Sequence, residues 1–212
     1  MSNYQSKIKL TKDELNKKIK KAEIISRNKL ISLFNEYGCT FEYKSMDIHC
    51  KYDLLLIIGD NLYIVEQKHR NNYDFNTPII QQGCMFNFDK YEHLLNEYEA
   101  SNYTLLPVYT STFDKNNNKV IVWYDLQNLP YTEIKQCYNE LKQKLDDRIK
   151  YLEDLGEEPN KHNLKHLTNK WCCIEWIKKV YEDPNSPKIP QVRILLPLPN
   201  KYNKFGKIMH IN

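Results

Sequence analysis

The sequence predicts an α/β protein with a mixed sheet. Three observations lead to this class: a long helical pattern opens the chain, β-rich segments follow it, and the helical period returns before two more β-rich segments. The composition agrees, because 212 residues with 41% hydrophobic and 27% charged residues can form both a core and a water-facing surface. We expect a core over residues 1–130 and an extension, packed on it, over residues 131–212.

The first helix is predicted from a capping box at residues 11–14, with the sequence Thr-Lys-Asp-Glu. Its polar side chains can bond the backbone amides that a helix start leaves free. Apolar residues then recur at helical spacing until Gly38 ends the pattern. These residues are Leu15, Ile19, Ala22, Ile25, Leu30, Leu33 and Phe34.

Three antiparallel strands are predicted next, at residues 40–43, 48–58 and 62–69. These segments are rich in β-branched, aromatic and other apolar residues and are separated by short polar breaks. Residues 59–61, Gly-Asp-Asn, are typical of a tight turn between the last two strands.

A second helix is predicted over residues 78–98, after a polar loop, with an irregularity around Gly83. Two strands follow at 103–113 and 119–125, joined by turn residues. The predicted order of the core is therefore α-β-β-β-α-β-β.

The extension is predicted to be a helical hairpin with a basic tail. One helix has the apolar stripe Ile134, Tyr138, Leu141, Leu145, Ile149 and Leu152 and stops at Gly156. A second helix is predicted over residues 163–182, where Pro184 prevents continuation. Its stripe consists of Leu164, Leu167, Trp171, Ile174, Ile177 and Tyr181. A last strand is predicted at residues 191–196.

Charged residues on the second and third strands form the candidate site. Period-two alternation places Glu66 and Lys68 on one face of the third strand. A two-residue turn at 59–60 puts Asp53 directly opposite Glu66, with Cβ atoms about 5 Å apart. A turn at 60–61 would put Asp53 opposite Lys68 instead, and a three-residue loop would split the site.

Two facing carboxylates repel each other unless a positive charge lies between them. Hard oxygen ligands suit Mg²⁺ or Mn²⁺, so we expect Asp53 and Glu66 to hold a divalent metal. Lys68 can orient a water or stabilise negative charge that develops on a phosphate. The alternative is a strand end on which these charges form ordinary salt bridges.

This combination resembles the PD-(D/E)XK nuclease superfamily, whose restriction-endonuclease-like core has the order αβββαβ. Members carry an Asp at the start of the second strand and (D/E)xK at the end of the third, and Asp53 with Glu66-Gln67-Lys68 matches this motif. The resemblance covers residues 11–126 and looks most like the resolvase-like branch. It implies a metal-dependent endonuclease that hydrolyses DNA phosphodiester bonds and selects branched or otherwise structured DNA.

The resemblance implies roles for three further residues. Family members often have a Glu on the first helix, and Glu23 is the candidate here, although it could instead form an i,i+4 ion pair with Arg27. Some members have a Gln on the helix after the motif, a place that Gln82 or its neighbour Gln81 occupies. The Gln67 carbonyl is a candidate third metal ligand.

Basic charge gathers at the two ends of the chain. Residues 1–30 hold nine Lys or Arg against three Asp or Glu, and residues 160–212 hold ten against three. We expect Lys201, Lys204 and Lys207 to contact nucleic acid, although lysines can also simply solubilise a terminus. Only four of the 31 basic residues are Arg, which favours backbone contacts over base-specific recognition.

DNA is thus the expected partner, and a membrane is not. The longest apolar run, residues 54–58, is far short of the roughly 20 residues of a membrane span. We expect a cytoplasmic location, or a nuclear one or a viral replication site. The residues leave open a homodimer, an RNA-directed nuclease, and a non-catalytic module on the same fold that binds nucleic acid or protein.

Overall fold

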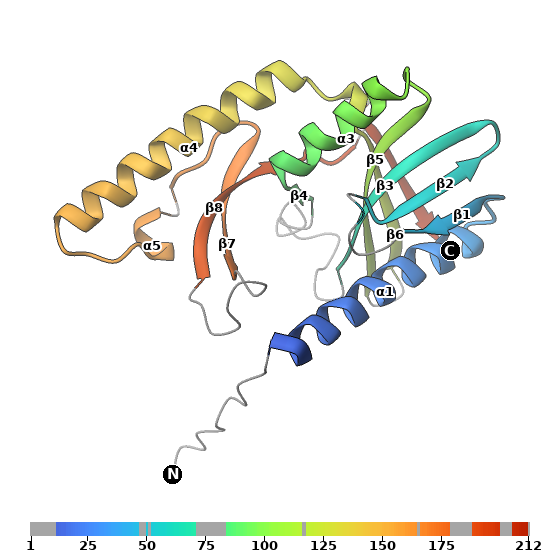
Figure 1. Cartoon of the computed structure of the whole chain (residues 1–212), viewed down its shortest axis with the longest axis horizontal. Helices are drawn as coiled ribbons and strands as arrows, with labels where there is room; N and C mark the ends of the chain where they lie inside the picture. The colour runs from blue at the N-terminus through green and yellow to red at the C-terminus, as the bar shows by residue number, and fades with distance from the viewer. Residues whose placement is uncertain are drawn as a thin grey trace, which may run out of the picture.

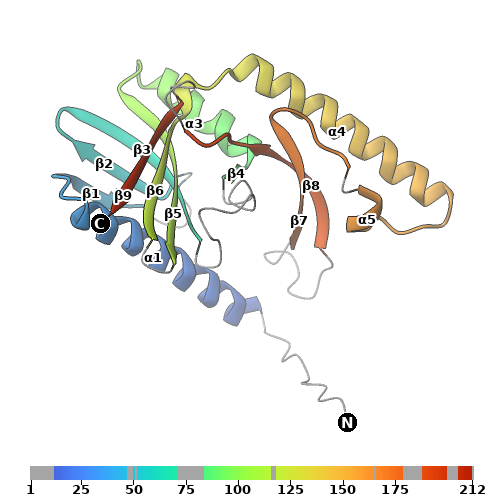
Figure 2. The same cartoon turned by 180° about the vertical axis from the view of Figure 1, so that it is seen from behind.

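The protein is a mixed α/β structure with two β-sheets, each covered by helices (Figures 1 and 2). The mixed sheet predicted from the sequence is confirmed. No described helix combines the length and apolarity of a membrane span. The computed structural model describes residues 12–46, 50, 52–70, 84–115, 118–164, 166–178, 188–199 and 205–211.

The larger sheet has six strands and the smaller has three. In spatial order, the larger consists of β1 (Glu42–Ser45), β2 (Leu54–Ile58), β3 (Asn61–Arg70), β5 (Leu105–Lys115), β6 (Asn118–Asp125) and β9 (Gly206–Ile211). The smaller consists of β4 (Met85–Phe86), β8 (Lys188–Leu195) and β7 (Cys172–Lys178). The helices are α1 (Lys12–Glu36), α3 (Phe88–Ala100), α4 (Tyr131–Asp154), the short α5 (Lys161–Leu164) and the 3₁₀ turn η1 (Leu126–Asn128).

Among the described residues up to 125, the predicted order α-β-β-β-α-β-β is confirmed, with the short strand β4 added before α3. All neighbours in the larger sheet are antiparallel except β3 and β5, which are parallel. A parallel pair needs a long crossover connection, and α3 lies within it. The helix α1 covers one face of this sheet and α3 covers the other (Figure 1).

The second half of α1 anchors this helix to the sheet. Leu30, Leu33 and Phe34 are fully or almost fully buried and pack against Leu54 and Val65 of β2 and β3. Their spacing follows one face of a helix, as the sequence predicted. Ahead of Arg27, every described side chain of α1 is exposed or half-exposed.

The hairpin of β2 and β3 has the register predicted from its turn. Ile58 pairs with Asn61, which leaves a two-residue turn at 59–60, and Gly59 has the positive φ of 60° that such turns favour. The pairing continues to Leu54 and Val65. The two-residue turn of the first predicted register is therefore confirmed. The paired residues end at Leu54, and Asp53, one position before them, donates its amide to the Val65 carbonyl at 2.8 Å.

The helix predicted at 78–98 begins later than expected. Residues 85–86 form β4, and α3 starts at Phe88, because the Asn87 side chain accepts a hydrogen bond from the Asp89 amide and caps the helix. Residues 78–83 lie outside the described part of the chain.

The predicted C-terminal helical hairpin is wrong in its second member. The first helix is present as α4, but residues 172–178 form the strand β7, which pairs with β8. The segment Cys-Cys-Ile-Glu-Trp-Ile-Lys is a short apolar run that fits a strand as well as a helix. The Asn169 side chain accepts hydrogen bonds from the Trp171 and Cys172 amides and turns the chain into the strand. The strand predicted at 191–196 is confirmed as the larger part of β8.

The C-terminal segment returns to the larger sheet, where β9 pairs with β6. A Cβ on Gly206 would lie 1.8 Å from the Trp123 carbonyl oxygen, so only glycine fits this close approach. The smaller sheet, beneath α4, shares one continuous apolar core with the α3 side of the larger sheet. That shared core fixes the two sheets relative to each other.

Candidate functional site

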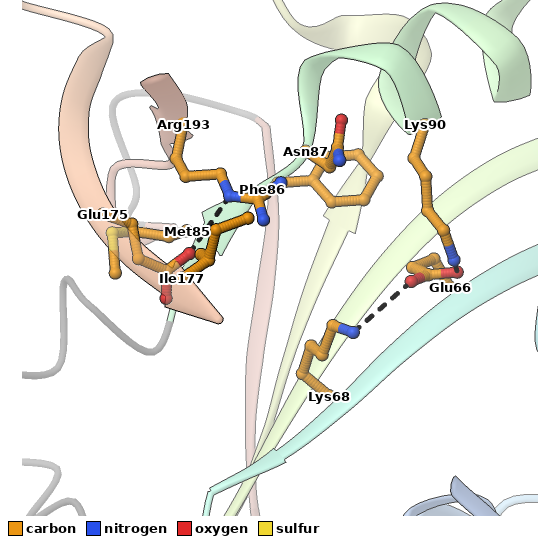
Figure 3. Close-up of a pocket in the computed structure, with 9 residues that line it drawn as sticks. All are labelled: Glu66, Lys68, Met85, Phe86, Asn87, Lys90, Glu175, Ile177 and Arg193. Atoms are coloured by element: carbon orange, nitrogen blue, oxygen red, sulfur yellow. Dashed lines mark hydrogen bonds and ion pairs between the residues drawn. The ribbon is translucent and has the colours of Figure 1, made fainter. Parts of the chain in front are cut away.

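A pocket of about 310 Å³ lies between the two sheets (Figure 3). One side is formed by β3 and the start of α3, and the other by β7 and β8. Met85, Phe86 and Ile177 supply apolar lining. The charged side chains that line it are Glu66, Lys68, Lys90, Glu175 and Arg193.

Glu66 lies at the base of this pocket and is only 1% exposed. Its Oε2 is 2.5 Å from Nζ of Lys90, which reaches down from α3, and its Oε1 is 3.7 Å from Nζ of Lys68, two residues along β3. Figure 3 shows the two lysines approaching the carboxylate from different directions. A carboxylate buried this far needs such partners, because an unpaired charge away from water is costly.

Burial raises the pKa of the Glu66 carboxyl above its ordinary value, and the negative charge of Asp53 raises it further. The positive charges of Lys68 and Lys90 act in the opposite direction but do not cancel these effects. Proton binding by Glu66 is therefore favoured relative to an exposed glutamate.

Asp53 is held rigidly where β2 begins. Its Oδ2 accepts a hydrogen bond of 2.8 Å from the Gln67 amide, and its Oδ1 lies 3.3 Å from Nη2 of Arg27 on α1. Arg27 also donates to the Met46 carbonyl at 2.7 Å. The first helix therefore orients the first candidate carboxylate.

Gln67 connects the site to both neighbouring elements. Ser26 of α1 donates to its side-chain oxygen, and the Gln67 side-chain amide donates to Thr112 of β5 at 3.0 Å. This side chain is buried on the α1 face of the sheet, opposite the face of Glu66. The predicted part of Gln67 as a carbonyl ligand stays a prediction, whereas its amide and side chain position Asp53 and α1.

The structure brings two of the predicted site residues, Glu66 and Lys68, together in the pocket, whereas Asp53 lies just before β2, outside the pocket lining, where its charge still raises the pKa of Glu66. Glu23 lies on α1, one turn before Arg27, and the described residues contain no group of three or more His, Cys, Asp or Glu that includes it with the two carboxylates. Arg27 pairs with Asp53, as described above. Lys207 lies on β9 with its Nζ 5.5 Å from the centre of the Trp123 ring. Gln81, Gln82, Lys201 and Lys204 lie outside the described residues.

Sequence reasoning missed the pocket's other charged residues, Lys90, Glu175 and Arg193. Lys90 is three residues past the helix cap Asn87, but nothing in its neighbours indicates that it reaches β3. Glu175 and Arg193 pair across β7 and β8, with 3.1 Å between Oε2 and Nε. Residues 172–177 form a short apolar run interrupted only by Glu175, and such a run does not distinguish a strand from a helix.

The carboxylate oxygens of Asp53 and Glu66 are the type of ligand atom that a hard divalent cation prefers. Asp53 lies just before β2 and Glu66 lies on β3, and the negative charge of Asp53 contributes to raising the pKa of Glu66. Arg27 and Lys90 already contact these carboxylates, so a metal ion would share or replace their contacts. The described residues contain no group of three or more His, Cys, Asp or Glu that could hold a metal, so these two carboxylates would hold Mg²⁺ or Mn²⁺ only with water or substrate oxygens in the remaining coordination positions.

Neither protein-family models, nor curated proteins, nor solved structures include a match to this chain. The geometry of the pocket is therefore the basis for assigning a function.

Proposed function

We propose that this protein is a divalent-metal-dependent nuclease that hydrolyses DNA phosphodiester bonds, as a structure-selective endonuclease similar to the resolvase-like branch of the PD-(D/E)XK superfamily. One observation carries the proposal: Glu66 is a buried carboxylate that lines a pocket, has Lys68 beside it, and is close enough to Asp53 for the charge of Asp53 to raise its pKa. A carboxylate buried this far is costly for a purely structural role.

In the proposed reaction Asp53 and Glu66 hold Mg²⁺ or Mn²⁺. The bound cation would supply Lewis-acid activation of the phosphate and a lowered pKa for water. Lys68, whose side chain is half exposed to the pocket, would bind the scissile phosphate or the attacking water and stabilise the charge of the transition state. Arg27 and the Gln67 amide keep the Asp53 carboxylate oriented.

Cleavage assays test this proposal directly. The purified chain is incubated with Mg²⁺, Mn²⁺ or EDTA and with single-stranded, duplex and four-way-junction DNA, and with RNA. We expect metal-dependent cleavage of DNA that Glu66→Gln abolishes and Glu133→Gln, a matched change on the exposed face of α4, leaves unchanged. Losing Lys68 (Lys68→Ala) should slow turnover about 10²- to 10³-fold while metal affinity is kept. The proposal fails if no substrate is cut, or if Glu66→Gln cleaves normally.

A second candidate is a non-catalytic module that binds nucleic acid. The observation that favours it is the neutralisation of both carboxylates by side chains of the chain itself, Asp53 by Arg27 and Glu66 by Lys90. This candidate predicts nucleic-acid binding that is unaffected by EDTA and accompanied by no cleavage. The same assays therefore separate the two functions.

A further inference from the structure

We propose that the pocket between the sheets admits a single unpaired nucleotide strand, and that Arg193 binds a phosphate of that strand on the wall opposite Lys68. The proposal rests on the nuclease function above and adds the form of the substrate. It assigns a binding role to the smaller sheet, which the motif on β2 and β3 does not include.

The size of the pocket suits one nucleotide. A volume of about 310 Å³ is at the lower end of the range for drug-sized ligands, which is the size class of one nucleotide. Glu66 lines the pocket with 1% of its surface exposed, so a phosphate must enter the pocket to approach it. An unpaired strand brings one nucleotide at a time between the sheets, whereas a base-paired strand brings its partner as well, so we expect the pocket to favour the unpaired form.

The wall opposite Glu66 presents a positioned guanidinium. Arg193 lies on β8, is 15% exposed, and its Nε contacts Oε2 of Glu175 at 3.1 Å. The ion pair with Glu175 is made by Nε, so the two Nη atoms of Arg193 take no part in it. Figure 3 shows the guanidinium extending from β8 toward Phe86 and Asn87, which line the same pocket. A planar guanidinium held at one edge can bind a phosphate through the other.

The charges lining the pocket favour an anionic ligand. Lys68, Lys90 and Arg193 contribute three positive charges against two negative charges from Glu66 and Glu175. Lys68 and Arg193 come from different sheets, so a strand that passes between them is contacted from both sides. Apolar atoms of Met85 and Ile177 in the same lining offer a surface for the sugar or base.

Substitutions of Arg193 and Glu175 should change oligonucleotide affinity in opposite directions, and this difference tests the proposal. Arg193→Gln removes a phosphate contact and should weaken binding of a fluorescent single-stranded oligonucleotide about tenfold, measured by anisotropy in Ca²⁺. Glu175→Gln removes a negative charge from the pocket and should tighten the same binding. If the pair only joins β7 to β8, both variants weaken binding alike or leave it unchanged.

The slope of log affinity against log salt concentration tests the Arg193 contact independently. Loss of one phosphate contact on a single strand lowers the slope of log affinity against log salt by about 0.7. We expect this decrease in Arg193→Gln and not in Arg148→Gln, which makes the same change of charge on α4, outside the pocket lining. An equal decrease in both variants would overturn the assignment. Thermal unfolding of each variant shows whether it is folded. If Arg193→Gln is unstable, Arg193→Lys replaces it in the test, and because this variant keeps the charge it should keep part of the wild-type affinity.

Substrate form is tested with the wild-type chain in Mg²⁺. Cleavage should require an unpaired segment, so single strands and junctions with splayed arms are cut and a fully paired, blunt or circular duplex is not. Efficient cleavage of closed duplex DNA would refute the strand proposal while supporting the nuclease. Oligonucleotide binding that depends on Arg193 without any cleavage would support the subsite and refute the nuclease.

Discussion

Replacing Lys90 with Met tests whether the fold depends on a charge contact at Glu66. The Nζ of Lys90 is 2.5 Å from a carboxylate oxygen that is almost fully buried, and the lysine is 43% exposed. Removing one partner of a buried ion pair costs about 3–5 kcal/mol. Solvent screening of the exposed lysine and the remaining contact with Lys68 reduce this, so we expect Lys90→Met to lower the free energy of unfolding by about 1–2 kcal/mol at pH 8.

The pH dependence of this loss identifies its cause. The pKa of Glu66 is raised in the folded state, so the folded protein holds this proton over a pH window in which the unfolded chain has lost it. Stability therefore falls as pH rises through that window. Without Lys90 the folded pKa is higher still and the decline is steeper. Below the ordinary pKa of a Glu, where Glu66 is neutral in both states, the variant and the wild type should converge.

Urea unfolding at pH 4, 6 and 8 measures the effect of Lys90→Met, with two controls. Lys170→Met removes the lysine from an exposed pair with Glu133 and should change stability little at any pH. In a Glu66→Gln background, Lys90→Met should also have little effect, because the charge that it compensates is gone. A loss of equal size at pH 4 and pH 8 would show that Lys90 contributes by packing, and would refute the reasoning.

Three other predictions concern the framework of the site. Glu66→Gln should raise the free energy of unfolding at pH 8 and flatten its pH dependence, which urea titrations measure, because the desolvated charge is removed. Ser26→Ala breaks the hydrogen bond to the buried Gln67 side chain and should cost about 1–2 kcal/mol, with faster hydrogen exchange in α1 as the readout. Gly206→Ala places a methyl group against the Trp123 carbonyl and should cost at least about 1–3 kcal/mol, with loss of amide protection in β9.

Local patterns predicted the elements on which the candidate carboxylates lie. The Gly-Asp pair at 59–60 permits a two-residue turn, and a one-residue change of register would move every side chain of β3 to the other face. Together with the apolar alternation, this was enough to predict the register of the β2–β3 hairpin, whose paired residues end at Leu54, one position after Asp53. The helices α1 and α4 were predictable for a similar reason, because their apolar stripes are long and regular.

The second wall of the pocket was not predictable in the same way. Residues 171–177 contain apolar side chains at spacings that satisfy both a helix and a strand, and a short apolar run does not distinguish them. The choice is made by tertiary pairing, since β7 is stabilised by hydrogen bonds to β8, about 15 residues further along the chain. Lys90 and Arg193 were missed because their partners, Glu66 and Glu175, are brought to them only by that packing.

Asp53 and Glu66 differ in how easily the basic side chains paired with them, Arg27 and Lys90, can move away. Arg27 is 9% exposed and is also bonded to the Met46 carbonyl, so it cannot leave Asp53 without breaking buried contacts. Lys90 is 43% exposed, and its flexible stem allows the ammonium group to turn into water. Glu66 can therefore exchange its lysine for another cation while Asp53 stays oriented by α1. In the proposed nuclease, the first helix would supply the rigid half of the site, and α3 would supply a charge that gives way to a metal ion or moves onto a phosphate.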